Sequence, residues 1–225
     1  MSEKWVYAFN EGDGKKKQLL GGKGANLCEM TRIGLNVPPG FVISTEACLA
    51  CLVTPERRLP DGVMAQVREH MAALEAVTGR AFGGRENPLL VSVRSGSAMS
   101  MPGMMDTILN LGLNADTLHG LIAQTGNERF AYDAYRRFIQ LFGKVALGVP
   151  DEAFDAEFEA VKQQAGVKQD IGLSAADLAA VAERFLVVVL EKTGRLFPVD
   201  PHEQLEIAIK AVFNSWLGKR AVDYR

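Results

Sequence analysis

Two basic residues stand in surroundings that suit phosphate binding. Lys23 follows two glycines in the segment LLGGKGANL (residues 19–27), and Arg94 ends an apolar run that leads into a loop rich in Gly and Ser. Glycine lets the backbone approach a ligand closely, and the first N–H groups of a helix attract anions. An arginine guanidinium can bind two phosphate oxygens at once. We therefore expect both segments to contact phosphate groups.

The glycine-rich segment differs from a Walker A loop. The spaced first glycine of that motif is missing, and Gly24 stands where Ser or Thr should follow the lysine. A purely structural turn with an exposed lysine is the alternative interpretation for Lys23. For Arg94 the alternative is a surface loop in which the arginine pairs with a nearby carboxylate.

The loop after Arg94, residues 95–106, carries almost no charge. It supplies hydroxyls, backbone N–H groups and glycine flexibility, whereas several carboxylates in this place would repel a triphosphate. These properties favour a loop that covers bound phosphates as a lid.

The cysteines raise the question of a metal or redox site. Cys48 and Cys51 have C-x-x-C spacing, and Cys28 is the third cysteine of the chain. A zinc site would need two more ligands, and the histidines have no ligand spacing, although a redox pair is conceivable. We favour the simpler interpretation that both residues lie on a short helix after Ser44. An odd number of cysteines without a secretory pattern is typical of reduced thiols in the cytoplasm.

Composition limits the class of protein. The chain has 225 residues, of which 48% are hydrophobic and 23% charged, with a net charge of −2. These values are typical of a globular protein of one large or two small domains. They predict no nucleic-acid partner and no membrane association, because basic blocks and long apolar runs are both absent from the sequence.

The first 112 residues or so mix strands with Gly-rich loops and short helices. We expect strands at residues 5–9, 41–43 and 89–94, the last of them buried, with residues 107–111 as its neighbour. Two helical stripes precede that buried strand, and their apolar positions are Leu27, Met30 and Ile33 before Gly34, and then Val63, Val67, Met71 and Leu74.

Residues 115–199 have a helical pattern. Apolar residues recur at helical spacing in three stretches: Phe130, Ala134, Phe138, Leu141 and Phe142; Phe154, Phe158 and Val161; and Leu178, Val181, Phe185 and Val188. Ser174 and Asp177 resemble a capping box before the third stretch. A last helix should begin at Asp200 and Pro201, end at Gly218, and bury Leu205, Ile209, Val212, Phe213 and Trp216.

Four segments resemble a known family. GGKGANLCEM, VPPGFVISTEAC, VSVRSGSAMSMPGMMDTILNLGLN and FNSWLGKRAVDYR are similar to the N-terminal nucleotide-binding region of the pyruvate phosphate dikinases, so the resemblance covers nearly the whole chain. The related phosphoenolpyruvate synthases share the lysine-bearing glycine motif and a strand ending in Arg-Ser, but their following loop differs.

The resemblance implies a reaction and a fold. The family converts ATP, phosphate and pyruvate to AMP, diphosphate and phosphoenolpyruvate, and a histidine on a separate domain carries the phosphoryl group. The implied fold is α+β, an incomplete ATP-grasp-like nucleotide-binding domain with an inserted all-helical subdomain. Residues 1–114 would form the first subdomain, 115–199 the helical subdomain, and 200–225 a helix returning to the first.

The resemblance also implies the site. The family's ATP-phosphate contacts correspond to Lys23 and Arg94, and the flanking glycines and the loop give the remaining candidates: Gly22, Gly96, Ser97, Met101, Gly103, Met104, Asp106 and Thr107. Mg²⁺ is expected to bind carboxylates of a second subdomain that follows residue 225. The implied partners are the phosphohistidine and pyruvate-binding domains of the same polypeptide, and the full-length protein is expected to be a homodimer.

The chain lacks three parts that the family has: the phosphocarrier segment, the pyruvate-binding barrel domain and the magnesium-binding carboxylates of the second subdomain. It has no Thr-Ser-His-Ala-type segment, so no catalytic residue is expected in it, and the chain should be an inactive fragment or a naturally short homologue. Other hypotheses are a synthase-type enzyme, a stand-alone nucleotide-binding or regulatory module, and a scaffold domain that has lost its ligand. Intact Lys23, Arg94 and loop glycines argue against the last of these.

Overall fold

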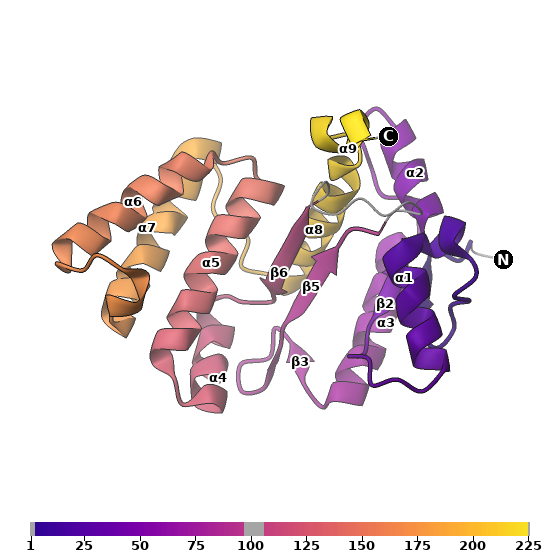
Figure 1. Cartoon of the computed structure of the whole chain (residues 1–225), viewed down its shortest axis with the longest axis horizontal. Coiled ribbons are helices and arrows are strands. Elements are labelled where there is room, and N and C mark those ends of the chain that lie inside the picture. The colour runs from indigo at the N-terminus through magenta and orange to yellow at the C-terminus, as the bar shows by residue number, and fades with distance from the viewer. Residues whose placement is uncertain (1–2, 97–105, 225) are drawn as a thin grey trace. The chain divides into compact units, whose positions relative to one another are not determined.

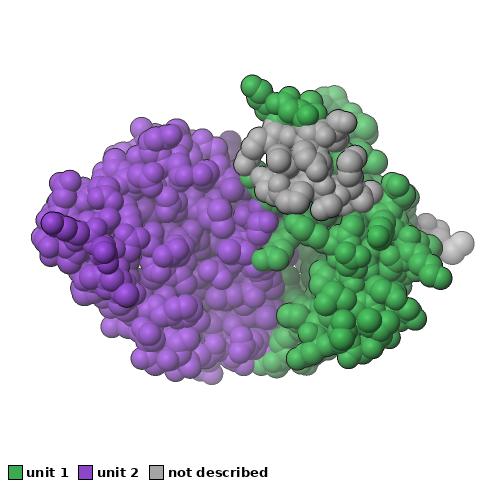
Figure 2. Space-filling model, in the orientation of Figure 1, with its two compact units in different colours: residues 1–79, 94–106, 209–225 green, residues 80–93, 107–208 purple. Residues whose placement is uncertain are grey.

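The chain combines helices with short strands, as expected for the α+β class. The computed structural model describes residues 3–96 and 106–224, which divide into two compact units. Unit 1 comprises residues 1–79, 94–106 and 209–225, and unit 2 comprises residues 80–93 and 107–208 (Figures 1 and 2). Arg94 and Gly96 therefore belong to the same unit as Lys23.

Unit 1 contains a small antiparallel sheet and several helices. Its elements are β1 (Val6–Ala8), α1 (Lys17–Arg32), β2 (Phe41–Ile43), α2 (Thr45–Val53), α3 (Val63–Thr78), the end of α8 (Pro201–Ser215) and α9 (Lys219–Tyr224). β1 pairs with β2 so that Tyr7 lies opposite Val42. The strands expected at residues 5–9 and 41–43 are thus confirmed.

Unit 2 is mostly helical. Its elements are β3 (Ala81–Phe82), β4 (Pro88–Leu89), most of β5 (Val91–Arg94), β6 (Thr107–Leu111), α4 (Ala115–Thr125), α5 (Glu128–Ala146), α6 (Asp151–Gln164), a 3-10 turn (Asp170–Gly172), α7 (Ala175–Thr193) and the beginning of α8. β3 and β4 pair in parallel, and β5 pairs with β6 as expected.

The prediction of one buried strand over residues 89–94 is wrong in part. Pro88 and Leu89 are buried in β4, but β5 is a separate strand in which half-buried and exposed residues alternate. Because successive side chains point to opposite faces of a strand, Ser92 and Arg94 share the exposed face. The side chain of Arg94 is therefore accessible to a ligand.

Helix α3 follows its sequence pattern closely. The four residues predicted from the spacing are its buried residues, Val63, Val67, Met71 and Leu74. On the same helix, the Gln66 side-chain oxygen accepts hydrogen bonds from the backbone N–H groups of Trp5 (2.8 Å) and Val6 (3.0 Å). This side chain satisfies donors at the start of β1 and ties that strand to α3.

Helix α1 buries a different face from the one predicted. Met30 and Ile33 are exposed, and the buried side chains are Leu20, Ala25 and Cys28. The reason lies in the contact with β2, since a Cβ atom at Gly24 would lie only 2.8 Å from Cγ1 of Val42. The helix therefore packs Gly24 against the sheet, and the apolar residues near the end of the helix point away from it.

Both cysteines of the C-x-x-C motif lie in α2, which confirms the simpler interpretation. The Ser44 hydroxyl caps this helix by accepting a hydrogen bond from the N–H of Ala47 at 3.1 Å. Burial, and to a lesser extent the neighbouring Cys51, raise the pKa of the Cys48 thiol to about 12. Burial also raises the pKa of Cys28 and Cys51. Because the thiolate is the reactive form, these raised pKa values make the thiols less reactive near neutral pH than an ordinary cysteine.

The half-buried thiol of Cys48 predicts a loss of stability in alkali. Below pH 9.0, the ordinary pKa of a thiol, Cys48 is protonated in both the folded and the unfolded chain. Between pH 9.0 and about 12 the unfolded chain loses this proton and the folded chain keeps it. The free energy of unfolding should then fall by up to about 1.4 kcal/mol per pH unit through this group. Urea unfolding at pH 8, 9.5 and 10.5 should show a shallower fall for Cys48→Ala, and equal slopes would contradict the prediction.

The buried face of helix α5 in unit 2 is shifted by about one residue from the face that the sequence predicts. Phe130 is 50% exposed, whereas the buried apolar residues are Ala131, Tyr135, Phe138, Ile139 and Phe142. Phe138 and Phe142 were predicted correctly. Their rings contact Phe197, which follows α7, at centroid distances of 5.6 and 5.2 Å. The sequence pattern had not included Phe197, because this residue lies outside any periodic stretch.

The predictions for α6 and α7 are largely confirmed. Phe154 and Val161 are buried and Phe158 is half-buried, and α7 buries all four predicted residues. The capping box is present, since Ser174 Oγ accepts from the N–H of Asp177 at 3.2 Å and Asp177 Oδ2 accepts from the N–H of Ser174 at 2.9 Å. These bonds satisfy two donors that helix geometry leaves free.

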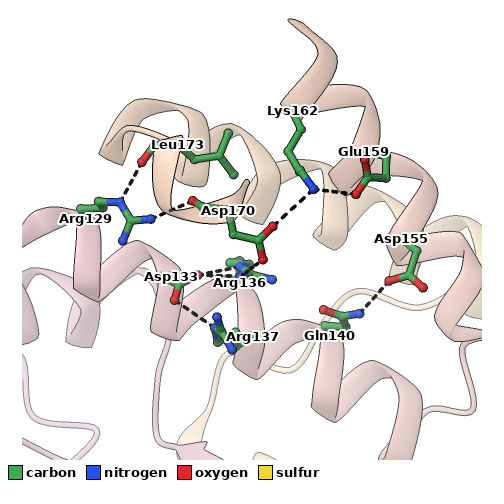
Figure 3. A network of polar contacts seen from close by, with 10 residues as sticks. All are labelled: Arg129, Asp133, Arg136, Arg137, Gln140, Asp155, Glu159, Lys162, Asp170 and Leu173. Carbon is green, nitrogen blue, oxygen red and sulfur yellow. Dashed lines mark hydrogen bonds and ion pairs between the residues drawn. The ribbon is translucent and has the colours of Figure 1, made fainter. Parts of the chain in front are cut away.

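A polar network joins α5, α6 and the 3-10 turn (Figure 3). The Arg136 side chain is only 6% exposed, and its Nε donates to Asp133 Oδ1 at 2.8 Å. Its Nη2 lies 2.7 Å from the same oxygen without good hydrogen-bond geometry, and 3.8 Å from Asp170 Oδ2. The guanidinium carbon lies 4.3 Å from the centroid of the Phe158 ring, and Lys162 reaches Asp170 at 3.4 Å. We did not predict this network.

Helix α8 begins as predicted and ends early. Asp200 Oδ1 accepts from the N–H of His202 at 3.0 Å, and Pro201 is the first helical residue. Leu205, Ile209, Val212 and Phe213 are buried, but the helix ends at Ser215, so Trp216 and Gly218 lie in a following turn. Gln204, which is fully buried, was not predicted: it accepts from the N–H of Gly112 at 3.0 Å and donates to Leu113 O at 3.0 Å.

Candidate functional site

The glycine-rich segment interrupts α1. Gly21 has φ 67° and ψ 164°, whereas the residues on both sides of it are helical. A helix that resumes after Gly21 has Lys23 in its first turn, as the sequence predicted. The first N–H groups of such a helical segment have no carbonyl four residues earlier to bond. Helix geometry therefore predicts free backbone donors close to Lys23.

The structure brings the two predicted segments together. A Cβ atom at Gly21 would lie 2.5 Å from the carbonyl oxygen of Gly96, so the two backbones touch there. From the other side, a Cβ atom at Gly96 would lie 3.9 Å from the N of Gly24 and 4.0 Å from Cβ of Lys23. Gly96 follows Arg94 by two residues. The loop that Arg94 introduces therefore begins on top of the resumed helix.

The predicted site residues differ in accessibility. Lys23, Arg94 and Gly96 are exposed, and Gly22, Asp106 and Thr107 are half-buried. The remaining candidates, Ser97, Met101, Gly103 and Met104, lie outside the described residues, as does most of the expected lid.

The charge balance at the two cations favours a ligand over an internal partner. Among residues 3–96 and 106–224, no carboxylate oxygen lies within 4.0 Å of the Lys23 ammonium or the Arg94 guanidinium. The alternative interpretation of Arg94 required such a carboxylate partner. Both side chains instead are exposed on unit 1 with no ion-pair partner among the described residues.

Two hydroxyl residues that we did not predict hold the surroundings of the site. The Thr45 hydroxyl donates to the carbonyl of Gln18 and lies 3.3 Å from that of Leu19, which fixes the turn before Gly21. Ser215 Oγ accepts from the N–H of Asp106 at 3.4 Å, at the far end of the loop. Thr45 follows the cap residue Ser44 and Ser215 ends α8, so neither position carries a recognisable signal in the sequence.

The described part of the chain offers no metal centre of its own. Within it, no three His, Cys, Asp or Glu residues come close enough together to hold a metal ion. Nor does any helix of that part have the length and apolar character that crossing a membrane requires.

Two comparisons with known proteins agree on one family. A family model described as pyruvate phosphate dikinase, AMP/ATP-binding domain, matches residues 17–56 and 52–225. The chain is 59% identical over 220 residues to the pyruvate, phosphate dikinase of Entamoeba histolytica, covering 98% of this chain and 25% of that protein.

Similar values hold for relatives from distant organisms. Identity is 50% over 229 residues to pyruvate, phosphate dikinase 1, chloroplastic, of Arabidopsis thaliana, and 48% over 223 residues to the pyruvate, phosphate dikinase of Clostridium symbiosum. These alignments cover 100% and 99% of this chain but only 24% and 25% of the relatives. The chain thus spans about a quarter of their length, and it belongs to the pyruvate phosphate dikinase AMP/ATP-binding domain family.

Proposed function

We propose that this chain is the ATP-binding part of a pyruvate phosphate dikinase, which converts ATP, phosphate and pyruvate to AMP, diphosphate and phosphoenolpyruvate. In this proposal Lys23 and Arg94 bind the phosphates of ATP. The observation that carries it is the contact of Gly96 with Gly21, because it brings the loop after Arg94 onto the glycine-rich helix start that holds Lys23.

The chemistry asked of these residues is binding and charge neutralisation. Phosphoryl transfer depends mainly on positioning and on stabilising the negative charge that moves between oxygens. A lysine and an arginine that have no carboxylate partner among the described residues suit that task, since none of those residues forms an ion pair that must break when a polyphosphate binds. The backbone donors after Gly21 would add directional hydrogen bonds to the same oxygens.

The remaining parts of the proposal concern what accompanies this chain. Mg²⁺ would neutralise further phosphate charge, but the described residues do not fit a magnesium site, so we assign it no ligand there. An ATP-grasp-like second subdomain, a phosphohistidine domain and a pyruvate-binding domain would belong to the same polypeptide. We also propose that the full-length protein is homodimeric and cytoplasmic. In this region we propose a first subdomain at residues 1–114, a helical subdomain at 115–199, and a helix at 200–225 that returns to the first.

Calorimetric titration of the 225-residue chain with ATP tests the proposal. Without the proposed second subdomain, Lys23 and Arg94 stay exposed to water, and we expect weak binding, near about 1 mM or roughly 4 kcal/mol. Raising the salt concentration should weaken it further, because exposed charges are screened over about 8 Å at physiological ionic strength. Lys23→Ala should reduce binding, whereas Lys168→Ala, which removes an exposed charge in unit 2, should not.

A turnover assay adds a second criterion. The purified chain with ATP, magnesium, phosphate and pyruvate should release no AMP, since no histidine of the chain lies in a phosphocarrier-type segment. Clear AMP release would show that a residue of this chain does the chemistry and would contradict the proposal. Equal ATP binding by Lys23→Ala and the unchanged chain would contradict the assignment of the site.

A further inference from the structure

Gly21 meets two constraints together, a positive φ and a close backbone neighbour, and the other described glycines of unit 1 meet at most one of them. Its φ of 67° with ψ of 164° falls in a region of backbone conformation that is essentially restricted to glycine. In addition, the Gly96 carbonyl occupies the space where a side chain would begin, with 2.5 Å from the Cβ position to the oxygen and 2.7 Å to the carbon.

The other described glycines of unit 1 with positive φ serve turns and helix ends. Gly34, Gly62 and Gly79 have φ values of 80°, 85° and 65°, and a Cβ atom at any of them would meet nothing within 4 Å. A substitution there would strain the backbone without displacing a neighbour. At Gly21 it would do both, so the two kinds of glycine can be compared by experiment.

The clash at Gly21 would move Gly96 and not α1. The Thr45 hydroxyl bonds the carbonyls of the turn just before Gly21, and Gly24 just after it packs on Val42 of β2. The helix is thus held on both sides of the break. Gly96, by contrast, is exposed, and even a Cβ atom added to it would make only ordinary contacts near 3.9 Å with the helix start.

We propose that Gly21 is a positioning residue of the nucleotide site: its missing side chain lets the Gly96 backbone rest on the helix start, which sets the distance between Arg94 and Lys23. The inference rests on the proposed function, because it assigns Lys23 and Arg94 to one polyphosphate. Gly21 itself need not touch the ligand. A displacement of about 1 Å in a polar site can cost on the order of 100-fold in rate, so a shift of Gly96 should be felt in binding as well.

The test compares Gly21→Ala with Gly34→Ala in the 225-residue chain. Both variants place alanine at a positive φ, and both should lose thermal stability. In ¹H–¹⁵N NMR spectra, the amide signals of Ser95 and Gly96 should move in Gly21→Ala and stay in place in Gly34→Ala. ATP titration at low salt, followed by the amides of residues 22–24, should show affinity reduced about tenfold or more in Gly21→Ala only.

The outcomes separate this inference from the proposed function. Equal ATP affinity of Gly21→Ala and the unchanged chain would overturn the positioning role while leaving the site intact. Absence of ATP-induced shifts in the unchanged chain would contradict the proposed function, and this inference with it. If Gly21→Ala does not fold, Thr45→Val removes the hydroxyl that bonds the carbonyls just before Gly21, and so loosens the surface on which Gly96 rests from the helix side. It should reproduce the loss of affinity, and unchanged affinity in that variant would equally overturn the inference.

Discussion

Replacement of Lys23 or Arg94 by alanine in the complete polypeptide is expected to slow the ATP half-reaction by roughly 10- to 150-fold. A hydrogen bond to a charged group contributes about 1.5–3 kcal/mol, and 1.36 kcal/mol corresponds to a tenfold change. Both side chains are exposed, and neither has a carboxylate partner within 4.0 Å among the described residues. Their removal therefore leaves no orphaned charge behind, and folding should be unaffected.

The second half-reaction provides the internal control. Exchange between phosphoenolpyruvate and pyruvate should survive both substitutions, because it takes place at a domain that this chain does not contain in our proposal. Lys168→Ala removes one exposed cation from unit 2 and should leave both half-reactions unchanged. A folded Lys23→Ala or Arg94→Ala variant that also loses the exchange would show that the residue has another role.

Local rules account for the elements that the sequence predicted well. The buried face of α3 repeats every three to four residues without interruption, and the caps at Ser44 and Ser174 satisfy helix N–H groups through their own hydroxyls. Such features depend on neighbours in the sequence. They can be read without knowledge of what packs against the helix.

Tertiary contacts decided the features that the sequence did not predict. The buried face of α1 depends on Val42 lying against Gly24, and the contact between Gly21 and Gly96 joins segments more than 70 positions apart. In the candidate site, Lys23 and Arg94 were found from residue type and context. Thr45 and Ser215 were not, because a hydroxyl that bonds a distant backbone group looks in sequence like any polar surface residue.

Arg136 was missed for a related reason, since an arginine on a polar helix face is usually solvated. In unit 2 it is buried, and it lies over the ring of Phe158 between two carboxylates. These carboxylates are not buried to the same degree, because the side chains of Asp133 and Asp170 are 24% and 49% exposed. Water can therefore still solvate the partners when the guanidinium is removed.

This difference in burial predicts that Arg136 stabilises unit 2 more through its packing than through its charge. Arg136→Ala should lower the stability of unit 2 by about 2–4 kcal/mol, in the range of a large buried side chain cut back to alanine. Arg136→Met, which keeps most of the volume against Phe158 and loses the charge, should cost less than about 1.5 kcal/mol. Arg137→Ala is the matched control: it loses an ion pair to the same Asp133 from a side chain that is 61% exposed, and should cost about 0–1 kcal/mol.

Native-state hydrogen exchange of the α5 and α7 amides measures these differences in unit 2 alone. Tryptophan fluorescence would report on the wrong unit, because both tryptophans of the chain, Trp5 and Trp216, lie in unit 1. Protection should fall most in Arg136→Ala, less in Arg136→Met and least in Arg137→Ala. An Arg136→Met variant as unstable as Arg136→Ala would mean that the ion pairs with Asp133 and Asp170, and not the contact with Phe158, provide the stability that Arg136 contributes. In that case added salt should weaken the unchanged chain far more than the Arg136→Met variant, because only the unchanged chain has the guanidinium charge for the salt to screen.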